Sequence, residues 1–397
     1  MSKRWPIRLV LVLLAALLIG CGAPLSVPVP TATPFTATPV LPTESPTAAI
    51  DTAATSASTS ALTSSRVPLV VFGAGSLIVP FGALEAAFEA LYPQIDLRAE
   101  YHGSIQVIRH ATELHEPIDV VATADASLIP MLMTGVNDPD TGRPYANWYI
   151  RFASNRLTLA YNQDSKYAAE LTADNWPEVL ARPDVKVGIA DPRFDAAGYR
   201  ALMAVVLAQE RARQYTYFAD LFKDQFVQPV TLFLDDNLAT VTVPEVLETR
   251  SGAHVVLRGA SIQLIALLES GDLDYAFEYE SVIRQHGLEM LRLPDEENLG
   301  AAEHAADYGR VQVNLDFRRF ATVRPRFRGE QIGYGITIPA SAPHPVEASQ
   351  FIAFLLSPQG RAIMEANYHP MFETPLADGY ERMPAVLQAL SRPAGTP

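Results

Sequence analysis

Two glycine–serine turns carry the first candidate chemistry in this chain. The sequence Gly73-Ala74-Gly75-Ser76 follows an apolar strand pattern and precedes a helical one, and His102-Gly103-Ser104 repeats that order further along. Because glycine lets the backbone come close to a ligand, the amides of Gly75 and Ser76 and the hydroxyls of Ser76 and Ser104 could donate to an oxyanion. The first turn is neither G-x-G-x-x-G nor a P-loop, since no lysine follows, and it could instead be a tight turn in which Ser76 is a plain helix cap.

Acidic residues offer a second kind of chemistry. Asp191 and Asp195 precede Gly198-Tyr199-Arg200, and Glu278 ends an apolar run. Two carboxylates could act as the general acid and base of a hydrolase. Alternatively, Asp195 could cap the helix that starts near Ala197, and Glu278 could be a solvated side chain at a sheet edge. The sequence leaves these alternatives open, because it does not show that the carboxylates meet.

These residues fall between alternating strand and helix patterns. Apolar or alternating runs predict strands over 67–73, 95–101, 118–123, 155–162, 185–190, 273–279 and 332–339. Apolar residues at helical spacing predict helices over 80–91, 104–114, 174–181, 199–214, 261–269 and 346–356. This alternation indicates an α/β fold with largely parallel sheets. In such folds ligands bind beyond the carboxyl ends of strands, where the candidate turns would lie.

The N-terminal region has the pattern of a targeting signal followed by a tether. Basic residues precede an apolar run at 9–19, which is shorter than the ~20 residues that a membrane-spanning helix needs. The run ends in Leu18-Ile19-Gly20-Cys21, which resembles a bacterial lipobox. We expect residues 1–20 to be a lipoprotein signal peptide and Cys21 to carry the lipid that anchors the protein outside the cytoplasmic membrane. An ordinary signal peptide with an incidental cysteine is the alternative.

Residues 21–66 are rich in Pro, Thr, Ala and Ser, and between 22 and 65 only Glu44 and Asp51 are charged. Such a segment cannot bury enough apolar surface to offset its ordering entropy, so we predict a lipidated, disordered tether. As a flexible coil it would reach roughly 35–40 Å, which would let the folded part search for a partner at the membrane. A stalk that serves only for spacing is the alternative.

Composition excludes several classes of protein. The 397 residues include 30 Lys and Arg against 44 Asp and Glu, a net charge of −14, which argues against a nucleic-acid-binding protein because that class needs a basic surface. Cys21 is the single cysteine, so internal disulfides, zinc knuckles and a cysteine nucleophile in the folded part are excluded. The length allows for about two domains.

Longer blocks of sequence resemble one family across roughly Val70 to Leu376. The blocks that carry the likeness include Gly103–His110, Trp148–Ile150, Gly198–Met203, Asp274–Tyr279 and Tyr334–Pro339. Taken together they resemble the archaeal-type tungstate/molybdate-binding proteins, the receptors of an ABC importer. The resemblance implies an α/β, two-lobed periplasmic-binding-protein fold of type II, a flytrap with mixed, largely parallel sheets whose lobes close by hinge motion. We expect the first lobe over 67–153, the second lobe and the return crossover over 154–340, and the C-terminal helices of the first lobe over 341–390.

The resemblance also implies a binding site. In the family two carboxylates complete a six-coordinate shell around the metal of the oxyanion, and the matching residues here are Asp195 and Glu278. The residues implied as donors to the oxo groups are Gly75, Ser76, Ser104, Ala196 and Ala197. The family's Asp-Pro-Cys reads Asp195-Ala196-Ala197 here. Because an alanine amide can donate where proline cannot, the donor geometry can differ from that of the family.

The function implied is that of an extracytoplasmic, lipid-anchored receptor that delivers tungstate or molybdate to an ABC permease and its ATPase. The implied protein is a monomer and not an enzyme, and it needs no cofactor and binds no nucleic acid. Carboxylates would repel sulfate or phosphate, whereas W(VI) and Mo(VI) accept additional oxygen ligands, so the acidic pair would select the metal oxyanions. The alternatives are a receptor for sulfate, phosphate or a ferric chelate, and a surface hydrolase.

Overall fold

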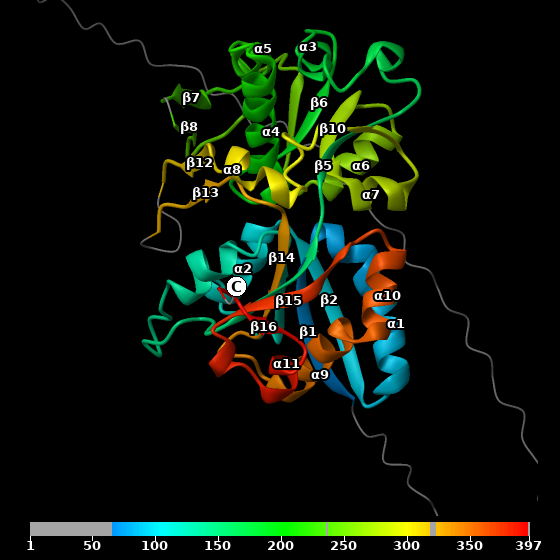
Figure 1. Ribbon diagram of the computed structural model, residues 1–397, viewed down its shortest axis with the longest axis vertical. Coiled ribbons are helices and arrows are strands. Elements are labelled where there is room, and N and C mark those ends of the chain that lie inside the picture. Colours follow the sequence, from blue (N-terminus) through cyan, green and yellow to red (C-terminus); the bar gives the residue numbers. More distant parts are fainter. Residues whose placement is uncertain (1–65, 236, 318–322, 396–397) are drawn as a thin grey trace, which may run out of the picture. The chain divides into compact units, whose positions relative to one another are not determined.

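The computed structural model describes residues 66–235, 237–317 and 323–395 (Figure 1). The predicted signal peptide, Cys21 and nearly all of the predicted tether lie outside these residues. The described chain forms three sheets of seven, five and four strands, with helices packed against them. None of the helices in these ranges is long and apolar enough to cross a membrane.

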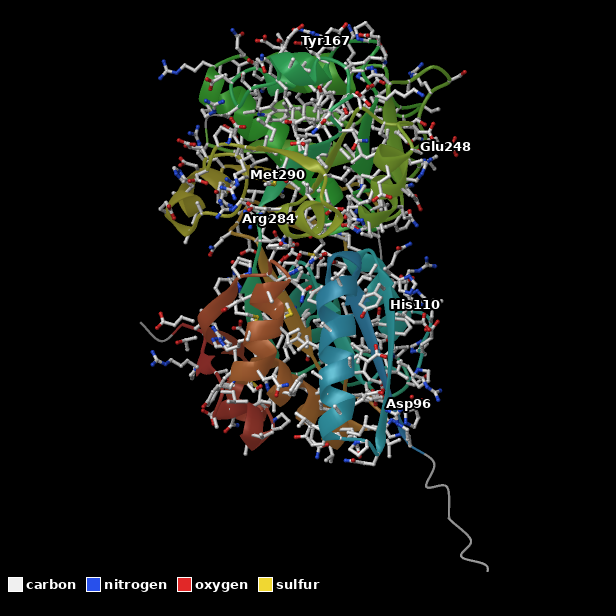
Figure 2. The ribbon with its side chains drawn as sticks, turned by 90° about the vertical axis from the view of Figure 1, so that its right-hand side faces the viewer. Asp96, His110, Tyr167, Glu248, Arg284 and Met290 are labelled. Atoms are coloured by element: carbon white, nitrogen blue, oxygen red, sulfur yellow. The ribbon has the colours of Figure 1, made fainter. Side chains whose placement is uncertain are left out.

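The seven-stranded sheet and its helices are called the first lobe here. The strand order is β16-β15-β4-β14-β3-β1-β2. Its strands are β1 (Val67–Ala74), β2 (Ile95–His102), β3 (Val120–Thr123), β4 (Tyr149–Ser154), β14 (Gly333–Thr337), β15 (Met371–Asp378) and β16 (Arg392–Pro393). Its helices are α1 (Ile78–Leu91), α2 (Ser104–Thr112), α9 (Pro345–Leu356), α10 (Pro358–Ala366) and α11 (Ala385–Gln388). Figure 2 shows α1 and α10 side by side on the outside of this lobe.

The five- and four-stranded sheets and their helices are called the second lobe. Their strand orders are β11-β5-β10-β6-β9 and β13-β12-β8-β7. The strands are β5 (Leu157–Tyr161), β6 (Val187–Ala190), β7 (Thr231–Leu234), β8 (Ala239–Val243), β9 (Val255–Arg258), β10 (Tyr275–Tyr279), β11 (Glu289–Arg292), β12 (Val311–Leu315) and β13 (Arg326–Arg328). The helices are α3 (Trp176–Leu180), α4 (Ala196–Ala212), α5 (Tyr217–Phe222), α6 (Ile262–Glu269), α7 (Glu280–His286) and α8 (Ala305–Tyr308).

The two larger sheets share one topology. In the first lobe β2, β1 and β3 are parallel and β14 runs antiparallel between β3 and β4. In the second lobe β9, β6 and β10 are parallel and β5 runs antiparallel between β10 and β11. In both lobes the antiparallel strand arrives from the other lobe, since β5 follows β4 and β14 follows β13. The predicted two-lobed α/β fold with mixed sheets is confirmed, with more antiparallel pairing than the strand–helix alternation indicated.

The elements with strong patterns match their predicted ranges closely. The pattern at 67–73 forms β1, and the pattern at 104–114 forms α2. Helix α4 begins at Ala196, earlier than the predicted residue 199. The strands that the patterns did not predict are β4, β7, β8, β9, β11, β12, β13, β15 and β16. Short strands with exposed residues, such as β7, lack the apolar alternation on which the prediction depends.

Apolar packing fixes the elements that carry the candidate residues. In the first lobe Phe81 and Phe88 of α1 pack edge-on against Phe351 of α9. In the second lobe α4 is buried without interruption from Ala196 to Gln209. A helix that is buried all round acts as a core element, and each large apolar side chain buried in this way contributes about 1.5–3 kcal/mol. The N-terminus of α4, where Asp195 lies, is therefore held firmly.

Candidate functional site

The structure brings Asp195 and Glu278 together around one serine. Asp195 follows β6 and is the N-cap of α4, and Glu278 lies on β10, the parallel neighbour of β6. Ser261, which precedes α6, donates its backbone N–H to Asp195 Oδ2 at 3.1 Å and its hydroxyl to Glu278 Oε1 at 3.1 Å. The two carboxylates that the sequence could not connect thus share a single partner.

Both carboxylates are withdrawn from solvent. Asp195 is 5% exposed and Glu278 is 0% exposed. Asp195 Oδ1 accepts from the Ala197 amide at 2.8 Å, so Asp195 does cap the helix, as one of its two predicted roles required. Glu278 Oε1 also accepts from the Tyr279 amide at 2.7 Å, whereas the buried Oε2 accepts no hydrogen bond from any described residue. A buried acceptor without a donor is costly, which marks Glu278 Oε2 as an atom prepared for a further contact.

Burial disfavours the ionised form of both carboxyl groups. The pKa of Glu278 is raised to about 8, chiefly by burial and also by the nearby charge of Asp195, while the hydrogen bonds from Tyr279 and Ser261 act in the opposite direction. Burial also raises the pKa of Asp195 to about 6, although the amides of Ala197 and Ser261 act in the opposite direction. Near pH 7 these shifts favour a proton on the pair, chiefly on Glu278.

The two predicted glycine–serine turns lie against this pair. A Cβ atom on Gly103 would stand 2.4 Å from the carbonyl oxygen of Phe194 and 3.2 Å from the Cβ of Asp195. A Cβ atom on Gly75 would stand 3.0 Å from Cγ2 of Ile262, the residue after Ser261. At both turns the close neighbour is a residue of the second lobe, and the approach to a ligand stays a prediction.

The two predicted serines are buried and engaged. The hydroxyls of Ser76 and Tyr334 are hydrogen-bonded at 2.8 Å, and Ser104 Oγ accepts from the Ala124 amide at 3.0 Å. Ser104 keeps its O–H as a donor in that arrangement. Of the two predicted amide donors at the start of α4, that of Ala197 is already bound to Asp195.

Two side chains of this cluster escaped the sequence analysis. Ser261 was noted only as the first residue of a helix, although Gly259-Ala260-Ser261 is a third strand–glycine–serine–helix turn, between β9 and α6. Tyr334 lies on β14, and its hydroxyl also accepts from Asn155 Nδ2 at 3.1 Å. A search for every such turn would have found Ser261, whereas no local pattern points to Tyr334.

Asp191, the third acidic candidate, is excluded from the cluster by its own neighbour. The Arg193 guanidinium donates to both of its oxygens, with Nε at 2.9 Å from Oδ1 and Nη2 at 2.5 Å from Oδ2. The guanidinium balances the charge of Asp191, whereas the Asp195 carboxylate accepts from the neutral backbone amides of Ala197 and Ser261. The two side chains therefore have different partners, although the Asp195 amide donates to the Asp191 carbonyl oxygen at 2.9 Å.

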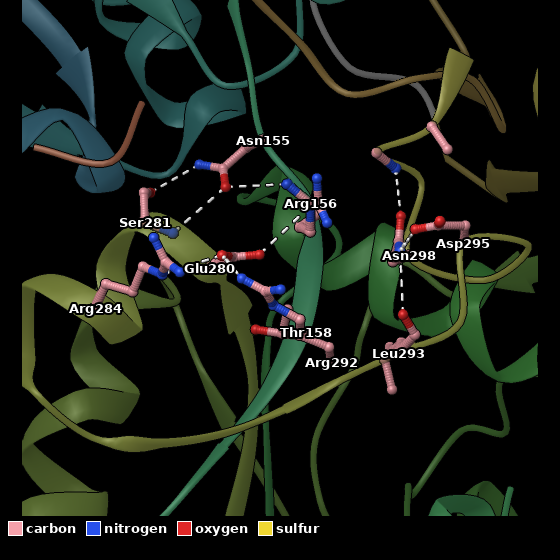
Figure 3. Close-up of polar contacts among 12 residues, drawn as sticks. Asn155, Arg156, Thr158, Glu280, Ser281, Arg284, Arg292, Leu293, Asp295 and Asn298 are labelled. Atoms are coloured by element: carbon pink, nitrogen blue, oxygen red, sulfur yellow. Dashed lines mark hydrogen bonds and ion pairs between the residues drawn. The ribbon is translucent and has the colours of Figure 1, made fainter. Parts of the chain in front are cut away.

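A second polar cluster, linked to the first through Asn155 and Tyr334, lies where the chain passes from β4 to β5 (Figure 3). Glu280 pairs there with three arginines, Arg292 at 2.7 Å, Arg284 at 3.1 Å and Arg156 at 3.4 Å. Asn155 Nδ2 donates to the hydroxyl of Ser281 at 2.8 Å. A pocket of about 350 Å³ opens beside them. The three arginines balance the charge of Glu280, so this cluster joins segments of the chain, although the buried Oε2 of Glu280 also accepts no hydrogen bond from any described residue.

Comparison with known proteins gives a consistent result. Residues 69–368 match the family described as bacterial extracellular solute-binding protein. An uncharacterized solute-binding protein of Methanoculleus marisnigri is 36% identical over 327 residues, which cover 82% of this chain and 87% of that protein. The molybdate/tungstate-binding protein WtpA of Thermococcus kodakarensis is 34% identical over 324 residues, which cover 80% of this chain and 86% of that protein.

A solved structure supports the fold alone. The sulfate-binding protein SubI of Mycobacterium tuberculosis superposes with a TM-score of 0.50 at 14% sequence identity, covering 78% of this chain and 88% of that protein. At that identity a shared fold carries no information about the ligand.

Proposed function

Because the chain belongs to the family of bacterial extracellular solute-binding proteins and has the two-lobed fold of periplasmic binding proteins, we propose that it captures tungstate or molybdate between its lobes and delivers it to an ABC permease. The observation that carries the proposal is the buried pair of Asp195 and Glu278, which share Ser261 while Glu278 Oε2 stays without a donor among the described residues.

The chemistry of the pair favours a metal oxyanion over a simple one. Two like unit charges 4 Å apart repel by about 4 kcal/mol at an effective dielectric constant of 20, so ionised carboxylates would oppose sulfate or phosphate. Tungsten and molybdenum in their hexavalent oxyanions accept further oxygen ligands, which Asp195 and Glu278 Oε2 would supply. The same contact would displace the proton that the buried pair retains.

The oxo groups of the ligand need donors, and the first lobe offers them. The backbone at Gly75 and the hydroxyls of Ser76 and Ser104 come from turns that touch Phe194, Asp195 and Ile262 of the second lobe. We therefore assign the ligand oxygens to the first lobe, with Ala196 as a further amide donor, and the metal to the carboxylates of the second lobe. The relative from Thermococcus kodakarensis, a molybdate/tungstate-binding protein at 34% identity, supports the proposed ligand.

The cellular setting belongs to the same proposal. The lipobox-like Cys21, the leader at 1–20 and the tether at 21–66 support a receptor held by lipid at the outer face of the cytoplasmic membrane. Its partners would be the permease and its ATPase, and it would act as a monomer without catalytic activity. The chain crossing at Asn155 and the return through β14 would serve as the hinge between the lobes.

Calorimetric titration with tungstate, molybdate, sulfate and phosphate tests the proposed ligand. We expect tungstate and molybdate to bind at least on the order of 1,000-fold more tightly than sulfate, a difference of about 4 kcal/mol that corresponds to the repulsion of one pair of unit charges at an effective dielectric constant of 20. Equal affinity for sulfate and tungstate would overturn the assignment of the carboxylates to the metal. Binding of phosphate or a ferric chelate alone would replace the proposal with a receptor for that anion.

A further inference from the structure

A buried ion pair joins the two lobes beside the site. Arg200 lies on α4 of the second lobe and Asp125 follows β3 of the first, and Nη2 of Arg200 is 3.3 Å from Oδ2 of Asp125. Their side chains are 3% and 6% exposed. Arg200 Nη1 also donates to the carbonyl oxygen of Ala124 at 2.8 Å, and the Tyr199 hydroxyl donates to the same Oδ2 of Asp125. Gly198-Tyr199-Arg200, singled out in the sequence but unused by the proposed ligand shell, thus makes contacts across the lobes.

Arg200 is connected to the residues that carry the proposed ligand groups. It lies on the helix that Asp195 caps, and its Nη1 donates to the hydroxyl of Tyr279, the residue after Glu278, at 2.7 Å. On the other lobe, Ala124 accepts from Arg200 through its carbonyl and donates its amide to Ser104 Oγ. A displacement of the lobes that breaks this ion pair would therefore also separate Ser104 from the carboxylates.

Each partner is anchored within its own lobe. Asp125 Oδ1 accepts from the amide of Ser127 at 2.9 Å and from its hydroxyl at 2.7 Å. On the second lobe the ring of Tyr199, next to Arg200, stacks on Phe327 of β13 with centroids 4.0 Å apart and planes at 9°. Asp125 and Arg200 can therefore move apart while these contacts within each lobe are kept.

Burial decides what this pair can do. Two charges removed from water regain little net free energy from each other, but a single charge left buried without its partner is strongly unfavourable. In an open molecule both groups would be hydrated, so loss of one partner would penalise the closed arrangement and leave the separate lobes intact. The pair therefore acts on the equilibrium between open and closed lobes more than on folding.

We propose that Arg200 and Asp125 form a clasp that exists only when the lobes are closed and that sets how long the ligand is retained. Both are positioning residues that act through closure and do not touch the ligand. The identity of the ligand in this inference rests on the proposed function, whereas the closure of the lobes does not.

Distance measurement between two spin labels tests the clasp with the full chain. In a Cys21→Ser background the labels go on Ala86→Cys of α1 and Asp220→Cys of α5, both of which are exposed. We expect Arg200→Met and Asp125→Asn each to shift the distances toward longer values, without ligand and with tungstate. Tungstate should dissociate from either variant on the order of 100-fold faster than from the unaltered chain. The double variant should recover part of that loss, because no charge is left alone.

A matched control separates the clasp from general stability. Glu297 is 0% exposed and pairs with Arg211 of the same lobe, so Glu297→Gln should lower the melting temperature but leave the label distances and tungstate dissociation unchanged.

Identical distance distributions for the unaltered chain, Arg200→Met and Asp125→Asn would overturn the clasp. If the unaltered chain fails to bind tungstate, the proposed ligand is wrong, and the ligand-free distances still decide the clasp. If Arg200→Met does not fold, Asp125→Asn still removes one partner of the ion pair. Arg200→Lys then tests the guanidinium contacts while it keeps the positive charge.

Discussion

The two lobes have equivalent frames with opposite chemistry. In the first lobe Gly75 and Ser76 follow β1, the middle one of the three parallel strands. In the second lobe Asp195 follows β6, which has the same position in its sheet. The equivalent neighbouring strands are β2 and β9, and each is followed by a serine, Ser104 in the first lobe and Ser261 in the second. One backbone topology thus presents neutral donors on one side and buried carboxylates on the other. A ligand with oxo groups around an electrophilic centre fits such an asymmetric pair of surfaces.

Neutralising the buried carboxylates of the second lobe should have the largest effect on tungstate affinity. We expect Glu278→Gln and Asp195→Asn each to weaken tungstate binding on the order of 100-fold, about 2.7 kcal/mol, because a neutral amide cannot replace a carboxylate as a metal ligand. The same changes should improve sulfate binding, since a repulsive charge is lost. Calorimetry with both anions measures the two effects.

Asp191→Asn is the matched control for the acidic pair. Asp191 lies close in sequence but is paired with Arg193, so its replacement should leave tungstate affinity unchanged. Wild-type tungstate affinity in both Glu278→Gln and Asp195→Asn would show that the acidic half of the site is misassigned.

The neutral half depends on close backbone contact. A Cβ on Gly103 would stand 2.4 Å from the Phe194 carbonyl oxygen, so Gly103→Ala should keep the lobes apart and weaken tungstate binding about tenfold or more, roughly 1.4 kcal/mol. Gly82→Ala on α1, with no heavy atom within 4 Å of the new Cβ, should leave affinity unchanged and stabilise the helix by up to about 1 kcal/mol. Equal affinities in the two variants would contradict a contact between the lobes at Gly103.

The equivalent serines give a finer test of the comparison. Ser261→Ala removes the hydroxyl bound to Glu278 but keeps the amide bound to Asp195, and Ser104→Ala removes the acceptor of the Ala124 amide. We expect a loss of about threefold to tenfold in tungstate affinity in each case, the equivalent of one hydrogen bond. Ser261→Ala should also move the titration of Glu278, followed by carboxyl infrared bands, to higher pH. Ser104→Ala should not do so.

The buried carboxylates of the second lobe should also make the stability of the protein depend on pH. The pKa of Glu278 is about 8 in the folded chain against an ordinary value of 4.5, so as pH rises through this window the unfolded chain releases a proton that the folded chain retains. Stability therefore falls as pH rises toward 8. Asp195, with a pKa of about 6, adds to this fall below pH 6.

Buried His369 acts in the opposite direction at lower pH. Burial lowers its pKa from 6.5 to about 4, so its contribution to stability is lost as pH falls from 6.5 to 4. Melting curves of the ligand-free protein between pH 6.5 and 8 avoid the titration of His369, and the Glu278→Gln variant separates the carboxylate from His304, whose pKa the hydrogen bond to Asp307 raises above 6.5. We expect the melting temperature to fall over that range and Glu278→Gln to flatten the fall; an unchanged slope in the variant would assign the pH dependence to another group.

Local patterns sufficed for much of this protein. The strand–glycine–serine–helix turns located Gly75, Ser76 and Ser104, and the extended apolar periodicity located β1, α1 and α4. They succeeded because strand and helix periods and the conformational freedom of glycine are properties of a few consecutive residues. The proposed roles of Asp195 and Glu278 came from the resemblance to a family, since an acidic residue after a strand is equally a cap or a solvated side chain.

Tertiary structure alone decided how these residues work together. It joined Asp195 to Glu278 through Ser261, assigned Asp191 to Arg193, and placed Arg200 on Asp125 of the other lobe. Partners such as Arg200 and Asp125 are distant in the chain and meet only when two independently formed sheets come into contact. Burial, which raises the pKa values of the acidic pair, is likewise a property of the packed lobes, so the sequence supplied the groups and the fold determined their charge and their partners.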